Sequence, residues 1–134
     1  MDSPPEDAGV RGRRTILVID DHAELRETTV MLLELAGYHA LEAADGPSGM
    51  RLAQACGPDL VLLDYAMPAM SGAEVGAALR RDPRTRAIKI LMHTGTREQV
   101  VRAAFDGYDG FLSKPVDSDR LFQAIGSALD QARS

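Results

Sequence analysis

The sequence has one cysteine, no tryptophan and only 4% aromatic residues among its 134 positions. Because Cys56 has no partner for an internal disulfide, the fold must rest on its hydrophobic core, and a reducing, cytoplasmic location is expected. No apolar run approaches the roughly 18 residues of a membrane-spanning helix, and no apolar signal-peptide segment opens the chain. Acidic residues (20) outnumber basic ones (15), which argues against a nucleic-acid-binding surface.

What the sequence does contain is a regular alternation of apolar runs and helical patterns over residues 14–134. Residues 1–13 are rich in Pro, Gly, Asp and Arg and are predicted to form a flexible tail. Five strand-like runs follow, each succeeded by a helical pattern: Ile16–Ile19, His39–Ala43, Leu60–Leu63, Ile88–Met92 and Gly110–Leu112. This alternation predicts one α/β domain, in which helices cover both faces of a parallel sheet.

The helical stretches carry signals for their buried faces and their starts. The first helix is predicted to bury four residues: Leu25, Leu32, Leu33 and Ala36. The last helix is predicted to bury residues at four-residue steps: Leu121, Ile125 and Leu129. Two capping boxes, in which side chains satisfy free N–H groups at a helix start, are predicted from Ser71 with Glu74 and from Thr96 with Gln99.

Polar groups gather where the predicted strands end. Asp20 and Asp21 close the first strand, Asp64 the third, Thr94 the fourth and Lys114 the fifth. In an open parallel sheet, ligands bind outside the carboxyl ends of the strands, where strand order reverses. Three carboxylates held together repel one another unless a cation joins them, and oxygen ligands suit a hard cation such as Mg²⁺. A carboxylate nucleophile, a cation, a hydroxyl and an ammonium form a site for a phosphoryl group on Asp64.

Each of these residues also has a purely structural explanation. Asp21 could cap the helix that follows it, Thr94 could be a packed β-branched residue, and Lys114 could lie on the surface. Five polar groups at the ends of four strands nevertheless favour the phosphoryl site. Neither histidine nearby is expected to carry the chemistry, because His22 is predicted to be exposed at a helix start. His93 is predicted to pack on the face of its strand opposite Thr94.

Together these motifs resemble the response-regulator receiver family of two-component signalling. The resemblance covers residues 14–132 and rests on four features: Asp20–Asp21, the segment LVLLDYAMPAMSG around Asp64, Thr94 and Lys114–Pro115. It implies a flavodoxin-like fold with five helices and a five-stranded parallel sheet in the order 2-1-3-4-5. It also implies a phosphorylation switch rather than an enzyme.

The resemblance assigns a role to each acidic residue. Asp64 would accept a phosphoryl group from a histidine kinase or a histidine phosphotransfer protein. Mg²⁺ or Mn²⁺ would bind Asp21, Asp64 and the backbone carbonyl of Ala66, with Asp20 acting through water. Pro68 and Gly72 match the turn that follows the acceptor, where Gly72 can lie close to neighbouring backbone.

The remaining residues would carry the signal outward. Thr94 and Lys114 would hold the phosphoryl oxygens, and the Lys114–Pro115 bond would be cis. Phe111 occupies the position of an aromatic residue that signals phosphorylation, although without a hydroxyl it could be simply a core residue. The affected surface would be the fourth helix, fifth strand and fifth helix, residues 97–132. It would serve an unnamed protein target or a homodimer, without direct contact with nucleic acid or membrane.

Two other functions are compatible with this fold. A phosphohydrolase with an aspartyl-phosphate intermediate would need a general acid, which in the best-known family is an Asp two residues after the nucleophile. Ala66 stands there, and no inserted cap encloses a substrate. A receiver-like domain that has lost phosphorylation would lack part of the residue set, which is intact. Because Ala66 has no charge to steer an attacking water, the lifetime of the phosphoryl group stays open.

Overall fold

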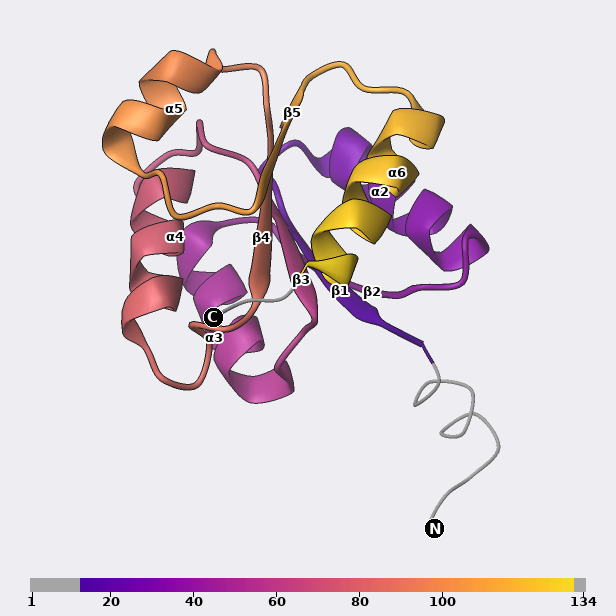
Figure 1. Cartoon of the computed structure of the whole chain (residues 1–134), viewed down its shortest axis with the longest axis horizontal. Helices are drawn as coiled ribbons and strands as arrows, with labels where there is room; N and C mark the ends of the chain where they lie inside the picture. The colour runs from indigo at the N-terminus through magenta and orange to yellow at the C-terminus, as the bar shows by residue number, and fades with distance from the viewer. Residues whose placement is uncertain (1–12, 132–134) are drawn as a thin grey trace, which may run out of the picture.

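The computed structural model describes residues 13–131 (Figure 1). The strands in this range are β1 (Thr15–Ile19), β2 (His39–Ala43), β3 (Leu60–Leu63), β4 (Lys89–Thr94) and β5 (Gly110–Ser113). The helices are α2 (Ala23–Leu35), α3 (Gly46–Cys56), α4 (Gly72–Arg81), α5 (Glu98–Ala104) and α6 (Ser118–Asp130). All five predicted strands are present, and only their ends shift. The predicted tail lies outside the described residues except for Arg13, so it stays a prediction.

The sheet is parallel throughout, with the strand order β2-β1-β3-β4-β5. The predicted flavodoxin-like fold is thereby confirmed. β1 pairs with β2 on one side and with β3 on the other, so the strand order reverses at β1. The carboxyl ends of β1 and β3 therefore flank the crevice in which such sheets bind ligands.

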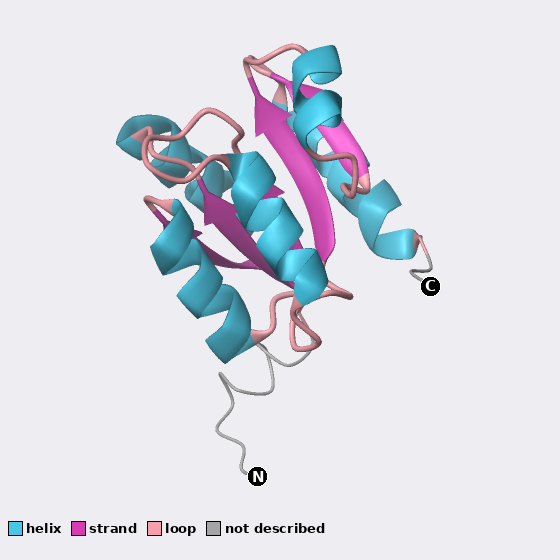
Figure 2. Ribbon diagram, turned by 90° about the vertical axis from the view of Figure 1, so that its left-hand side faces the viewer, coloured by secondary structure: helices cyan, strands magenta, loops and turns pink. Residues whose placement is uncertain are grey.

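Helices cover both faces of the sheet (Figure 2). The core on one face joins the sheet to α3, α4 and α5, and the core on the other face joins it to α2 and α6. The apolar face predicted for the last helix is confirmed, because Leu121 and Ile125 are buried and Leu129 is partly buried. Within residues 13–131, no helix combines the length and the apolar character that a membrane crossing requires.

The buried face predicted for the first helix, α2, is only partly correct. Leu33 is fully buried and Leu32 is half-buried, but Leu25 and Ala36 are exposed. Thr29 takes the buried position four residues before Leu33, and its hydroxyl donates to the carbonyl of Leu25 at 2.8 Å. Because this hydroxyl is satisfied within the helix, a polar residue can face the core there. A prediction based on apolar residues alone therefore misplaces the buried face of α2.

One of the two predicted capping boxes forms. Ser71 accepts a hydrogen bond from the backbone N–H of Glu74, and Glu74 accepts one from the N–H of Ser71. The prediction for Thr96 is wrong, because α5 begins after Arg97 and no described side chain caps it. The N–H of Thr96 instead donates to the Thr94 hydroxyl at 3.2 Å. That bond holds Thr96 in the loop and moves the helix start by one residue.

Candidate functional site

Two buried carboxylates stand side by side at the carboxyl edge of the sheet. Asp20 directly follows β1 and Asp64 directly follows β3, and each is only 3% exposed. The backbone N–H of Asp64 donates to the carbonyl of Ile19 at 3.0 Å, and that of Asp20 donates to Ala43 at 3.2 Å. These bonds continue the strand pairing beyond the strand ends. They fix the two carboxylates at the predicted position.

The acidic cluster also contains Asp21 and His22. One ligand atom from each of Asp20, Asp21, His22 and Asp64 lies within 4.8 Å of the others. Asp21 Oδ1 is buried but makes no hydrogen bond among the described residues. The ring nitrogen Nδ1 of His22 is 3.4 Å from that atom, which is an ion pair only when His22 is protonated. An orphaned carboxylate oxygen beside two buried carboxylates fits a hard divalent cation such as Mg²⁺.

Lys114 supplies the positive charge that the described residues place in the cluster. Its Nζ donates to Asp20 Oδ2 at 2.8 Å and to Asp64 Oδ2 at 3.3 Å. The backbone N–H of Lys114 donates to the carbonyl of Thr94 at 2.9 Å, which fixes the end of β5 against the end of β4. The Lys114–Pro115 peptide bond is cis. Lys114 is therefore not a surface lysine but a bridge between two acidic residues.

The electrostatics of the site appear in two shifted pKa values. Burial raises the pKa of Asp20, but hydrogen bonds from Lys114 and from the backbone N–H of His22 outweigh it and leave the pKa below its usual range. Asp20 is thereby held as a carboxylate that orients Lys114. Burial lowers the pKa of His93, and the nearby Lys114 ammonium lowers it further. His93 is only 5% exposed, and its neutral form is favoured. Its packing on the face opposite Thr94 stays a prediction.

The start of α2 differs from the structural alternative in which Asp21 caps this helix. Asp21 does not cap α2, whose N-cap residue is His22. The backbone N–H of His22 instead donates to Asp20 Oδ1 at 2.9 Å. The side chain of His22 is 67% exposed, which confirms the predicted exposure. Asp21 is therefore left available for a ligand.

Thr94 ends β4 and Phe111 lies on β5, and neither has a described contact with Asp64. Thr94 is fully buried, and its hydroxyl accepts a hydrogen bond from the N–H of Thr96. Phe111 is half-buried and packs against the core beside α5, with its ring 5.9 Å from that of Tyr108. Tyr108 escaped prediction, because its neighbours come from separate segments and no local motif marks them.

The loop after Asp64 is held tightly against the backbone of Asp64 and Tyr65. The N–H of Gly72 donates to the carbonyl of Tyr65 at 2.8 Å, and a Cβ atom on Gly72 would overlap the carbonyl oxygen of Asp64. The predicted close approach of Gly72 to neighbouring backbone is confirmed. Ala66 is exposed, and its carbonyl accepts no backbone hydrogen bond from the described residues. Its contribution to a metal site stays a prediction.

The sequence matches one known protein family along most of its length. The family model described as the response regulator receiver domain matches residues 16–126. The chain belongs to this family. Receiver domains are signalling domains that accept phosphoryl groups from histidine kinases, and the Asp20, Asp21 and Asp64 cluster fits Mg²⁺ binding and phosphorylation.

Curated relatives and solved structures agree with this assignment. The chain is 36% identical over 116 residues to the DNA-binding dual master transcriptional regulator RpaA of Synechocystis sp., covering 85% of this chain and 48% of that protein. It is 37% identical to the nitrate/nitrite response regulator NarL of Escherichia coli, covering 85% of this chain and 54% of that protein. The receiver domain thus spans about half the length of these relatives.

The structural neighbours are receiver domains as well. The chemotaxis response regulator CheY4 of Vibrio cholerae superposes with a TM-score of 0.81 at 28% identity, covering 87% of this chain and 98% of CheY4. A CheY-like receiver domain protein of Methanospirillum hungatei gives a TM-score of 0.78 at 29% identity, covering 88% and 94% of the two chains.

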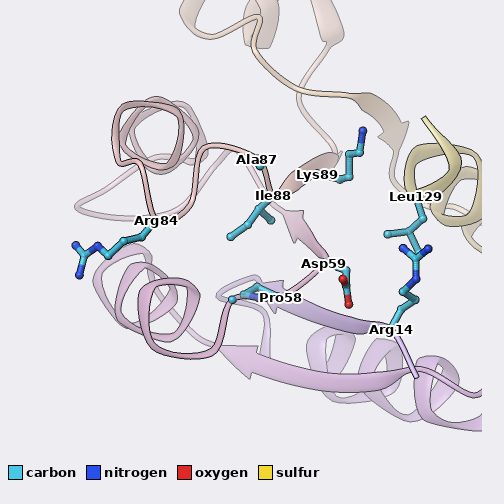
Figure 3. Close-up of a pocket in the computed structure, with 9 residues that line it drawn as sticks. Arg14, Pro58, Asp59, Arg84, Ala87, Ile88, Lys89 and Leu129 are labelled. Carbon is cyan, nitrogen blue, oxygen red and sulfur yellow. The ribbon is translucent and has the colours of Figure 1, made fainter. Parts of the chain in front are cut away.

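A pocket of about 310 Å³ is lined by residues at the amino ends of β1, β3 and β4 (Figure 3). It therefore lies at the opposite end of these strands from the acidic cluster. Lys89, the first residue of β4, contributes to its lining and is only 8% exposed. The Nζ of Lys89 is buried and makes no hydrogen bond among the described residues. The nearby Asp59 carboxylate accepts a hydrogen bond from the N–H of Thr15 at 2.7 Å. A buried amino group that makes no hydrogen bond costs stability.

We expect Lys89→Met to stabilise the receiver domain. The substitution keeps most of the apolar stem and removes a buried charge without a partner, a change worth about 1–3 kcal/mol. Urea unfolding should show a higher free energy of unfolding for Lys89→Met. Arg81→Met, which removes the same charge from an exposed position, should change it little. A lower free energy of unfolding for Lys89→Met would contradict this explanation.

Proposed function

We propose that this receiver domain accepts a phosphoryl group on Asp64 from a histidine kinase or a histidine phosphotransfer protein, and thereby changes its binding to a partner protein. The observation that carries this proposal is the bridge of Lys114 Nζ between the carboxylates of Asp20 and Asp64, beside the orphaned oxygen of Asp21. One cation and three carboxylates at a strand-order reversal suit a phosphoryl group better than an organic substrate.

Each residue of the cluster would have its own role in phosphoryl transfer. A carboxylate oxygen of Asp64 forms a bond to the phosphorus of the donor phosphohistidine, while the phosphorus–nitrogen bond breaks and its electron pair returns to the imidazole. Bound Mg²⁺ or Mn²⁺ supplies positive charge that offsets the charge of the phosphoryl oxygens. Asp21 and Asp64 would hold the cation, with the Ala66 carbonyl, and Asp20 would act through water. Lys114, oriented by Asp20, would hold a phosphoryl oxygen.

The residue at position 66 favours a domain that acts by binding a partner over one that catalyses a reaction on a separate substrate. Ala66 offers no general acid two residues after the acceptor, so rapid hydrolysis as in an aspartyl-phosphate phosphatase is not supported. The protein would act in the cytoplasm, where a histidine donor and Mg²⁺ are both available. Phosphorylation would draw the Thr94 hydroxyl towards the phosphoryl group. The surface of α5, β5 and α6, residues 97–132, would then change for a protein target or a second copy.

Incubation with acetyl phosphate tests the proposed chemistry without a partner protein. In the presence of Mg²⁺, intact-mass measurement should show one added phosphoryl group per chain, and addition of EDTA before the reaction should prevent it. Acetyl phosphate is a suitable phosphoryl donor because this small molecule needs no protein docking surface. A chain that gains no phosphoryl group, or gains it equally well in EDTA, would count against a metal-assisted acceptor.

Replacing Lys114 with alanine should separate phosphorylation from the conformational change that follows it. The cation carries most of the charge stabilisation, so Lys114→Ala should still be labelled by acetyl phosphate, although more slowly. The link from the phosphoryl group to β5 would be lost, because Lys114 is the residue that joins them. Amide chemical shifts should then change around Asp64, and those in residues 97–132 should change less than in wild type. If Lys114→Ala shows shift changes in that range as large as those of wild type, Lys114 does not couple the phosphoryl group to this surface.

A further inference from the structure

Tyr108 connects the start of α5 to Phe111 on β5. It lies in the segment between these two elements, and its hydroxyl donates to Glu98 Oε2 at 2.7 Å. Glu98 is the first residue of α5. On its other side, the Tyr108 ring packs against Phe111 with a centroid separation of 5.9 Å and against Phe105 at 6.4 Å. One side chain thus contacts two of the three elements of the proposed output surface, α5 and β5.

The bond between Tyr108 and Glu98 involves a charged acceptor. The hydrogen bond from Tyr108 and then the one from Arg102 lower the pKa of Glu98, so that its carboxylate form is favoured. Arg102 donates to the same Oε2 atom at 2.6 Å, and its guanidinium lies 5.8 Å from the centroid of the Tyr108 ring. Hydrogen bonds to ionised acceptors are stronger than those between neutral groups.

The bonded residues form a path from the acidic cluster. Thr94 holds the N–H of Thr96 through its hydroxyl, and Glu98 follows two residues later at the start of α5. Glu98 then accepts from Tyr108, whose ring contacts Phe111. A displacement of Thr94 would move the loop that precedes Glu98, and it would thereby strain the hydrogen bond between Tyr108 and Glu98. Phe111 has no hydroxyl of its own with which to hold a resting position.

We infer that Tyr108 is a positioning residue that holds Phe111 and the start of α5 in the unphosphorylated arrangement, and that its hydrogen bond to Glu98 opposes activation. The inference rests on the proposed function, because it needs a phosphoryl group that draws Thr94 inward. A contact present in only one of two states shifts the equilibrium towards that state. Removing the hydroxyl should therefore favour the activated state.

The test uses Tyr108→Phe, which keeps the ring and removes only the hydroxyl. With Mg²⁺ present, this variant should bind beryllofluoride, a mimic of aspartyl phosphate, about three- to tenfold more tightly than wild type, the range expected for loss of one hydrogen bond of the resting state. Tyr38→Phe is the matched control, because Tyr38 packs against the core on the other face of the sheet. It should leave the affinity unchanged.

Two further readouts separate positioning from general loosening of the fold. Glu98→Gln should also tighten beryllofluoride binding, although less, because its uncharged amide oxygen can still accept from Tyr108. The double variant should bind no more tightly than Tyr108→Phe alone, because both substitutions act on the same hydrogen bond. In wild type, beryllofluoride should raise the pKa of Glu98, followed by carbon NMR of its carboxyl group, towards its usual value.

The outcomes distinguish this inference from the proposed function. If wild type binds no beryllofluoride, both are wrong. If wild type binds it and Tyr108→Phe binds it equally or more weakly, the proposed function stands and the inference for Tyr108 is overturned. Full additivity of Tyr108→Phe and Glu98→Gln would also overturn it.

Discussion

Asp64→Ala should abolish phosphoryl incorporation from acetyl phosphate. Asp64 is buried at the end of β3, and Lys114 Nζ lies 3.3 Å from its carboxylate. The other buried carboxylate of the cluster, Asp20, is engaged by Lys114 at 2.8 Å and by the N–H of His22 at 2.9 Å. It is therefore a poor substitute for the missing nucleophile. Intact-mass measurement after a fixed incubation gives the extent of labelling.

The control for this loss is an aspartate outside the cluster. Asp106 is exposed in the segment after α5, and Asp106→Ala should be labelled as fast as wild type. Circular dichroism should show that Asp64→Ala keeps its fold, since loss of one of several crowded carboxylates relieves repulsion. Equal labelling of Asp64→Ala and wild type would remove Asp64 from its proposed role.

The second large effect is expected for Mg²⁺ affinity. Asp21 carries a buried oxygen that makes no hydrogen bond among residues 13–131, so that atom is free to bind a cation. Asp21→Ala should weaken Mg²⁺ binding by at least about tenfold, because loss even of groups that only orient a ligand costs about 10–100-fold. Asp20→Ala should weaken it less, since Asp20 is proposed to act through water. Isothermal titration calorimetry gives both constants.

The same substitution should act in the opposite direction on the metal-free protein. Removal of Asp21 relieves repulsion among neighbouring carboxylates, so the free energy of unfolding in EDTA should rise. Weaker binding together with a more stable metal-free fold is the signature of a metal ligand. A Mg²⁺ affinity of Asp21→Ala equal to that of wild type would show that the cation binds elsewhere or through other oxygens.

Much of this fold could be predicted because its strands are buried on both sides. The runs Ile16–Ile19 and Leu60–Leu63 are continuously apolar, which is typical of strands in a covered parallel sheet. The alternation with helices then determines the fold class, and the polar residues after the strands mark one edge. The topology of the sheet therefore largely determines where the acidic cluster lies.

Features that depend on single hydrogen bonds could not be predicted in the same way. Thr29 occupies a buried position of α2 because its hydroxyl reaches the carbonyl of Leu25. The start of α5 shifts because Thr96 binds Thr94. The partnership of Tyr108 with Glu98 joins positions ten residues apart on separate segments. None of these contacts has a periodicity or a motif, so each becomes visible only when the chain is folded.

The most direct measurement locates the phosphoryl group itself. Borohydride reduction of the acetyl phosphate-treated receiver domain converts an aspartyl phosphate to homoserine, which peptide mass spectrometry can assign to one position. If Asp64 is the acceptor, homoserine should appear there alone and disappear when Mg²⁺ is removed before labelling. Homoserine at Asp20 or Asp21, or a labelled protein without homoserine at position 64, would contradict the proposed site.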